Sequence, residues 1–367
     1  MKLAWTQALA WRLRRQLLDP VGTAPVEEVV RRLGAVAAQS EFASELSIRT
    51  RCQRSEPDDV GRAREDGRII STFSFRGSTH LMAPEDAGIY LAVRMSGRQW
   101  ELKSWRTYYR LEPSDWPALG EVVREALADG PLTVAELIAA IAKTPRFAHL
   151  GPILGENPWA VMKALTWHGD MSFGPATKGR STFQRLDTNP RWAGIPELDE
   201  AGPRAVEAYL RTYGPATAEN VQYWLGNGLS APRKQLQSWI GALRERLVEV
   251  EIERSRAMLL DDDLAELEAT PPSSTVRLLP AYDQWVLGPG TADPTVVPPA
   301  RRALVTRGAN IVTVGGVVTG TWALKDDEVA IDWFAEAGPP PKAALDTEVA
   351  RLADLLDRPP RSRLQAA

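Results

Sequence analysis

The chain has few of the residues that build metal and redox sites. Its 367 residues include one cysteine, Cys52, and three histidines, His80, His149 and His168, which lie far apart. A single cysteine excludes an internal disulfide framework and a cysteine-rich zinc site. No HExxH pattern occurs. We therefore expect no metal and no cofactor, although a magnesium site made only of carboxylates stays open.

Long apolar runs are also missing. No uninterrupted apolar run reaches the roughly 18 residues that a membrane-spanning helix needs. The N-terminus lacks a signal-peptide pattern, because Arg12 and Arg14 come too early for an apolar segment to form before them. We expect a cytoplasmic, nucleoid-associated protein.

Lysine is scarce, since only 8 of the 44 basic residues are lysine and the rest are arginine. The net charge is −3, but residues 1–110 hold 18 basic and 13 acidic residues, so the basic excess lies at the N-terminal end. Arginine suits phosphate and guanine-edge contacts. A GC-rich genome is the competing explanation of the arginine bias, and both explanations stay open.

An internal near-repeat organises the middle of the chain. Residues 130–137 and 214–221 share a Gly-Pro turn, a threonine that can cap a helix (Thr133 and Thr217), and an acidic residue in the first helical turn. A helix is predicted before each copy, over 116–127 and 204–213, and another after each, over 159–167 and 232–247. Strand-like sequence follows, as a hairpin within 171–186 and as a strand over 248–253. Three helices and a hairpin are the order of a winged helix-turn-helix.

The N-terminal segment fits the same plan less closely. It predicts helices over 6–18, after a Thr23 cap, and over 40–51, then strands over 69–75 and 78–82. After residue 257, short β-prone runs at 276–279, 303–306, 311–314, 317–322 and 329–333 suggest a small barrel or sheet. A helix over 343–356 and a loose tail over 358–367 complete the chain.

These elements predict an α+β fold class with three tandem winged helix-turn-helix domains and a C-terminal β-barrel-like domain. The expected boundaries are 1–113, 114–195, 196–257 and 258–367. Most tryptophans have the spacing of helix-core residues and are expected to pack inside rather than stack on bases. This expectation covers Trp5, Trp11, Trp159, Trp167 and Trp224.

Several segments together resemble the winged-helix DNA glycosylases of the AlkZ/YcaQ-like family. Each is weak alone, but they occur in the family's order and cover nearly the whole chain. They are Leu33-Gly34-Ala35-Val36-Ala37-Ala38-Gln39, Arg76-Gly77-Ser78-Thr79-His80-Leu81, Pro84-Glu85-Asp86, Tyr213-Gly214-Pro215-Ala216-Thr217, Trp224-Leu225-Gly226, Leu279-Pro280-Ala281-Tyr282-Asp283 and Gly316-Val317-Val318-Thr319-Gly320-Thr321-Trp322.

The resemblance implies three winged helices that cradle duplex DNA and excise alkylated purines, especially guanines modified at N7. Some relatives unhook interstrand crosslinks or remove bulky adducts in producers of DNA-alkylating natural products. The family's catalytic tripeptide maps to Ala37-Ala38-Gln39. Its last polar position is Gln39, the candidate catalytic residue, whereas Ala37 replaces the first, commonly Gln or His. Glu41 is a reserve candidate, and a structural amide is the competing reading of Gln39.

The candidate DNA-binding residues lie on the predicted third helix and at two hairpins. Each also has a plainer reading, as a solvated arginine or, for His80, a structural hydrogen-bonding group. The candidates are Arg49, Arg51, Arg76, His80 and Arg180.

The leading hypothesis is a monofunctional glycosylase, a hydrolase acting as a monomer on damaged double-stranded DNA, with self-resistance to a genotoxic natural product as its setting. Ala37 motivates an alternative, a non-catalytic winged-helix DNA-binding protein that regulates transcription or sequesters a lesion or drug. The modest net charge motivates a third, a protein-interaction scaffold.

Overall fold

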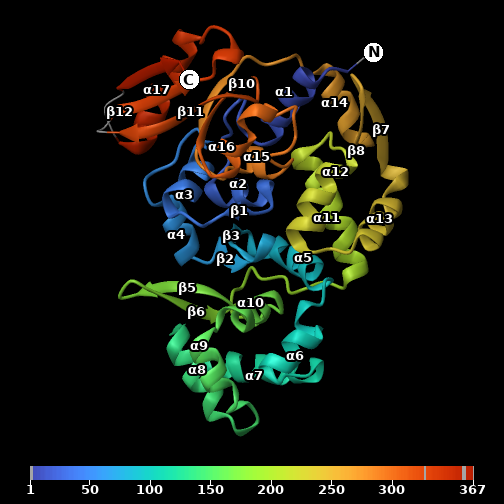
Figure 1. Cartoon of the computed structure of the whole chain (residues 1–367), viewed down its shortest axis with the longest axis vertical. Coiled ribbons are helices and arrows are strands. Elements are labelled where there is room, and N and C mark those ends of the chain that lie inside the picture. Colours follow the sequence, from blue (N-terminus) through green and yellow to red (C-terminus); the bar gives the residue numbers. More distant parts are fainter. Residues whose placement is uncertain (1–2, 326–327, 358–360, 367) are drawn as a thin grey trace. The chain divides into compact units, whose positions relative to one another are not determined.

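The structure, a computed structural model, describes residues 3–325, 328–357 and 361–366. The chain forms two compact units (Figure 1). The first unit joins residues 1–62 to residues 206–224 and to the part of the chain after residue 239, whereas the second holds residues 63–205 and 225–239. The first unit is therefore assembled from three separate stretches of the chain.

The helix α1 (Trp5–Arg15) is shared between two cores of the first unit. Leu9 and Leu13 pack with Trp285 and Ile311, and Trp11 packs with Ile252. Apolar side chains on opposite sides of α1 thus join the β7–β8 hairpin to the C-terminal region. The remaining elements of this first stretch are α2 (Val26–Leu33), β1 (Val36–Ala37) and α3 (Glu41–Arg49), and α4 (Asp59–Glu65) crosses the unit boundary.

The C-terminal strands of the first unit form one sheet, in the order β13-β12-β11-β10-β9. Helix α17 packs on it, with Leu345, Val349 and Leu352 against Trp322 and Trp333 (Figure 1). The neighbouring pairs are antiparallel except β12 and β13, which run parallel. The bounds are β9 (Val276–Leu279), β10 (Asn310–Val314), β11 (Val317–Lys325), β12 (Glu328–Trp333), α17 (Lys342–Leu356) and β13 (Ser362–Ala366).

The second unit combines a sheet with a cluster of helices. Its strands follow the order β3-β2-β5-β6-β4, and one core contains Phe73, Leu119, Leu137, Leu165 and Phe183. The elements are β2 (Ile70–Phe73), β3 (Thr79–Met82), α5 (Pro84–Met95), α6 (Lys103–Tyr109), α7 (Trp116–Ala126), β4 (Leu132–Thr133), α8 (Val134–Lys143), α9 (Leu150–Glu156), α10 (Trp159–Trp167), β5 (Met171–Thr177) and β6 (Arg180–Arg185).

Helix α11 (Leu198–Tyr213) begins in the second unit and ends in the first. The elements that follow it are α12 (Ala218–Val221), α13 (Arg233–Ala242), β7 (Leu247–Ile252), β8 (Ser255–Leu260), α14 (Leu264–Ala269), α15 (Gln284–Leu287) and α16 (Arg302–Thr306).

The two threonine caps predicted from the near-repeat are confirmed. Thr133 accepts from the backbone N–H of Glu136 at 3.4 Å, and Thr217 accepts from that of Asn220 at 3.2 Å. In both copies the third helical residue bonds back to the threonine backbone, so each forms a full capping box. The order of helices followed by a hairpin is present in both copies. The number of winged-helix units and the four-domain division stay predictions.

Four sequence expectations are wrong. Thr23 does not cap α2, because the residue before that helix is Pro25, which has no side-chain cap. Residues 303–306 are helical rather than extended, and the helix ends before Gly308, whose φ of 84° favours glycine. Over the described residues the C-terminal strands make an open sheet, not a closed barrel.

The fourth correction concerns the tail, which was expected to be loose. Residues 362–366 instead form β13 and pair with β12, from Ser362 opposite Val329 to Ala366 opposite Trp333. The rest of that expectation, at 358–360 and 367, lies outside the described residues.

Candidate active site

Gln39 lies on an exposed bend between β1 and α3. Strand β1 ends at Ala37, and Ser40 caps the new helix by accepting from the backbone N–H of Ala43 at 3.3 Å. The chain therefore has only three residues in which to turn from strand to helix, and Gln39 is the middle one. Its amide stands at the surface beside the N-terminal end of α3, not inside a core.

Ala37, the other end of the tripeptide, is buried in β1 with 8% of its surface exposed. A methyl group offers no hydrogen bond to a substrate or to water. Glu41, the reserve candidate, is exposed in the first turn of α3. Among the tripeptide's side chains, then, only Gln39 is both polar and exposed.

Arg51 was expected to contact phosphate, but its side chain is fully buried. Its two terminal nitrogens donate to the two carboxylate oxygens of Asp283, at 2.8 and 2.7 Å. The same guanidinium donates to the carbonyl of Ser47 at 2.6 Å. Since these partners occupy the guanidinium inside the protein, we correct the expectation and assign Arg51 a structural role.

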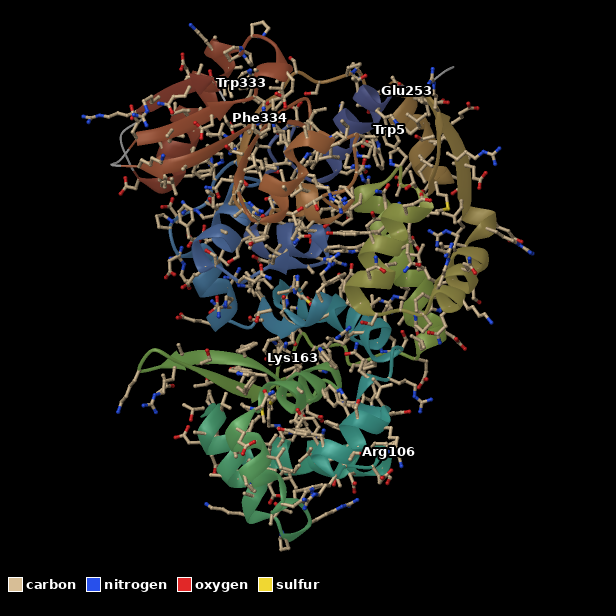
Figure 2. All side chains as sticks on the ribbon, in the orientation of Figure 1. Trp5, Arg106, Lys163, Glu253, Trp333 and Phe334 are labelled. Carbon is tan, nitrogen blue, oxygen red and sulfur yellow. The ribbon has the colours of Figure 1, made fainter. Side chains whose placement is uncertain are left out.

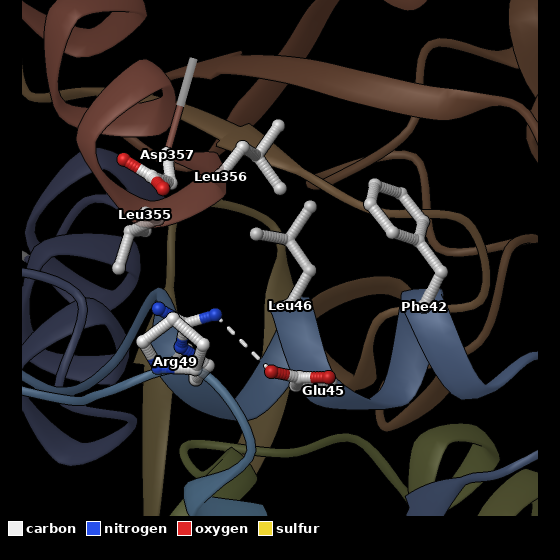
Figure 3. Close-up of a pocket in the computed structure, with 8 residues that line it drawn as sticks. Phe42, Glu45, Leu46, Arg49, Leu355, Leu356 and Asp357 are labelled. Carbon is white, nitrogen blue, oxygen red and sulfur yellow. Dashed lines mark hydrogen bonds and ion pairs between the residues drawn. The ribbon is translucent and has the colours of Figure 1, made fainter.

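Arg49 lies at the edge of a cavity of about 360 Å³ on one face of α3 (Figure 3). Only 7% of the residue is exposed, and it donates to Glu45 at 3.1 Å and to the Ser55 hydroxyl at 3.2 Å. The cavity wall opposite α3 is the end of α17, with Leu355 and Leu356, and the exposed ring of Phe42 closes one side. Arg49 thus reaches a cavity while it is held by a carboxylate.

His80 was expected at a strand end near the DNA, but it is buried, with 4% exposed. Its Nδ1 lies 3.0 Å from the Ser78 carbonyl oxygen, and its ring packs against Phe75. Burial lowers the pKa of His80 to about 4, although the bond to Ser78 opposes the shift. Because the ring is buried and its Nδ1 faces the Ser78 carbonyl, the structure favours the structural reading of His80 over a phosphate contact.

Arg76 and Arg180 are exposed, as expected for hairpin residues that could meet DNA. Arg76 sits in the 3₁₀ turn η1 (Phe75–Gly77) with a φ of 53°, in the left-handed region. Arg180 begins β6, directly after the Lys178–Gly179 turn. Both stay candidate DNA-binding residues.

Tryptophan burial follows the expectation with one exception. Trp5, Trp11, Trp167 and Trp224 are buried, whereas Trp159 is 44% exposed. Helix periodicity did not predict this exposure, because Trp159 is the first residue of α10 and the apolar face of a helix is poorly defined at its first residue. The signal that was available is Lys163, one turn later, which marks the same side of the helix as exposed.

Within the described residues, no group of three or more His, Cys, Asp or Glu side chains could hold a metal ion. No described helix is both long enough and apolar enough to cross a membrane.

Comparisons with known proteins identify the family of the chain. A family model described as "DNA glycosylase AlkZ-like" matches residues 30–355. The chain therefore belongs to the AlkZ-like DNA glycosylase family. It is 34% identical over 360 residues to an interstrand DNA cross-link repair glycosylase of Streptomyces sahachiroi, covering 96% of each protein. It also matches the solved structure of Streptomyces sahachiroi DNA glycosylase AlkZ with a TM-score of 0.93 and 32% identity, covering 100% of both chains.

Proposed function

We propose that the chain is a monofunctional DNA glycosylase that hydrolyses the N-glycosidic bond of alkylated purines, either N7-alkylguanines, bulky adducts or interstrand crosslinks. The observation that carries the proposal is the exposed Gln39 amide, at the motif position, in a chain that belongs to a DNA glycosylase family. The name of the Streptomyces sahachiroi relative adds interstrand crosslinks as a substrate.

Removal of an N7-alkylated base needs little catalytic assistance from the protein. Alkylation at N7 places a positive charge on guanine, so the base leaves readily and the sugar becomes cationic. The main task is then to hold a water molecule at C1′. The Gln39 carbonyl oxygen can accept a hydrogen bond from that water and orient its lone pair toward the sugar.

Hydrolysis by water, without strand cleavage, fits the residues near Gln39. An enzyme that also cuts the strand uses an amine to form a covalent intermediate with the sugar. No lysine occurs between Lys2 and Lys103, and Gln39 lies within that stretch. We therefore propose water, not an amine, as the nucleophile.

We also propose that the protein acts as a monomer on damaged duplex DNA in the cytoplasm, and that it protects a cell exposed to a DNA-alkylating natural product. Expression in a sensitive host tests this role. Survival on a crosslinking agent should rise with the parent chain and not with a Gln39→Ala variant.

The direct test is an excision assay on a duplex with one N7-methylguanine, one bulky N7 adduct or one crosslink. Abasic sites should appear and should be cut only after alkaline treatment. Strand breaks before alkaline treatment would contradict monofunctional chemistry.

Ala37 favours a second candidate, a non-catalytic DNA-binding protein that sequesters a lesion or regulates a gene. Its buried methyl group leaves the tripeptide with one polar partner where the family has two. Tight binding to every lesion tested, with no abasic sites, would favour this candidate. A strong preference for one undamaged sequence would favour a regulator.

A further inference from the structure

Lys163 is the one charged residue of α10, whose sequence is WAVMKALTW. Its Nζ lies 5.2 Å from the centroid of the Phe73 ring (Figure 2). It also lies beside the turn η1, because a Cβ atom placed on Gly77 would be 3.5 Å from Nζ. Over the described part of the chain, Lys163 makes no ion pair with a carboxylate. Its charge therefore rests on an aromatic face without a counter-ion.

The surroundings of Lys163 add further positive charge. Arg76 is exposed on the same turn, one residue before Gly77. Arg94 is 6% exposed, lies over the Trp167 ring at 4.3 Å, and donates to the neutral side chains of Gln99 and Ser230. Burial, and then the charge of Arg94, lower the pKa of Lys163. An anion brought to this place would therefore be attracted by Lys163 and by the charge of Arg94.

Trp159 lies one turn before Lys163 and rests on the same ring. Its indole meets Phe73 edge-on, with 6.2 Å between centroids, and Phe73 is itself fixed edge-on against Phe173 at 5.0 Å. Although Trp159 is held at one edge, 44% of it is exposed. In proteins that bind single strands, exposed aromatic groups beside a cation stack on bases. The bases of a duplex are already stacked on one another, so there the ring can pack on a deoxyribose of the backbone.

The place of α10 in its unit suits such a contact. Helices α7, α8 and α10 are followed by the β5–β6 hairpin, and in helix-turn-helix proteins the last helix before the wing is the one that meets the DNA. We propose that Trp159 and Lys163, the Trp159–Lys163 patch, contact duplex DNA. The Lys163 ammonium binds a backbone phosphate and the Trp159 ring packs against the adjoining nucleotide. The inference rests on the DNA-binding part of the proposed function and not on excision.

The phosphate contact is tested by the salt dependence of binding to an undamaged duplex. Each phosphate neutralised adds about 0.9 to the slope of log K against log salt concentration. Lys163→Gln should lower the slope by about that amount, and Lys163→Met should do the same while keeping its alkyl chain over Phe73. Lys163→Arg should keep the slope. An exposed lysine on α17 supplies the control, since Lys342→Gln should leave the slope unchanged.

The aromatic contact has a different signature, because it involves no counter-ion. Trp159→Ala should weaken duplex binding about fivefold without changing the salt slope. Exposed Tyr108→Ala in the same unit is the control and should bind as the parent chain does. Circular dichroism and the melting temperature establish that each variant is folded.

Three results would overturn the proposal. They are an unchanged slope for both Lys163→Gln and Lys163→Met, unchanged affinity for Trp159→Ala, or equal losses on a single strand of the same length. If the parent chain bound duplex DNA but excised no lesion, the glycosylase proposal would be wrong and this one would be unaffected. If the parent chain excised lesions and the Lys163 and Trp159 variants bound DNA as it does, this proposal would be wrong and the glycosylase proposal would be unaffected.

Discussion

Arg51 and Asp283 form a buried ion pair with two contacts, at 2.8 and 2.7 Å, although 232 positions separate them in the chain. Neither side chain is exposed. Asp283 also accepts from the Ser47 hydroxyl at 2.6 Å and from the backbone N–H of Trp285 at 2.8 Å. The carboxylate thus ties the region after α3 to the start of α15, within the unit that carries Gln39. The tie therefore holds the C-terminal end of α3.

Breaking the pair should destabilise the first unit. Removal of one partner leaves an uncompensated buried charge, so Arg51→Met or Asp283→Asn should lower the free energy of unfolding by about 3–5 kcal/mol. Urea denaturation at pH 7 measures it. The exposed pair Arg301–Glu336 is the matched control, and Glu336→Gln should leave stability close to that of the parent chain. Equal effects at the two pairs would contradict the structural role of Arg51.

Gln39 should matter for rate and not for folding. Because its amide is exposed, Gln39→Ala should unfold at the same urea concentration as the parent chain, yet excise N7-alkylguanine about 100-fold more slowly, as expected for loss of a group that positions the attacking water. Single-turnover kinetics measure the rate. Exposed Gln53 in the same unit supplies the control Gln53→Ala. Parent-like excision by Gln39→Ala would remove Gln39 from the mechanism.

His80 should make stability depend on pH. Its folded pKa of about 4 lies below the unfolded value of about 6.5, so the unfolded chain takes up a proton first as the pH falls. Stability from neutral His80 is complete above pH 6.5 and is lost progressively between about 6.5 and 4. From pH 7 to pH 5 the loss is about 2 kcal/mol.

The comparison that isolates this contribution is the parent chain against His80→Gln, with the free energy of unfolding measured at both pH values. The variant should lose about 2 kcal/mol less than the parent between pH 7 and pH 5. Parallel pH profiles for the two proteins would show that His80 is not the group responsible.

The two capping boxes should contribute similarly to stability. Thr133→Ala and Thr217→Ala each remove a bond to an otherwise unpaired helix N–H, which costs about 1 kcal/mol. Thr23→Ala is a discriminating control, because the sequence pattern suggests a cap there and the structure has none. Thermal or urea unfolding measures all three. A loss at Thr23 as large as at Thr133 would show that the cap assignments are wrong.

Local signals in the sequence predicted most helices and strands. Thr133 and Thr217 were found because a cap, an acidic or amide residue three positions later and an apolar helix occur together within a few residues. The expectation failed where the outcome depends on distant partners. Residues 362–366 carry no strong strand pattern, and β12 provides the backbone partner that makes them a strand.

The candidate site residues also differ in whether local sequence or distant partners decide their surroundings. Gln39 was selected from a short motif, and the structure places it at the surface beside the Ser40 cap of α3, while its catalytic role stays a prediction. The burial of Arg51 could not be predicted, because an exposed arginine and a buried one look alike until Asp283 is placed beside it. His80 follows the same rule, since its burial depends on Phe75 and on the aromatic ring of Tyr90 that packs against Phe75.

Because the first unit is made of separate stretches of the chain, its parts are synthesised at different times. At about 5–20 residues per second, the ribosome takes on the order of 10–50 s to add the 232 residues between Arg51 and its carboxylate partner. During that interval α3 lacks its anchor, whereas the continuous stretch 63–205 is completed before Asp283 is added. The bend bearing Gln39 is therefore synthesised long before the carboxylate that anchors the C-terminal end of α3.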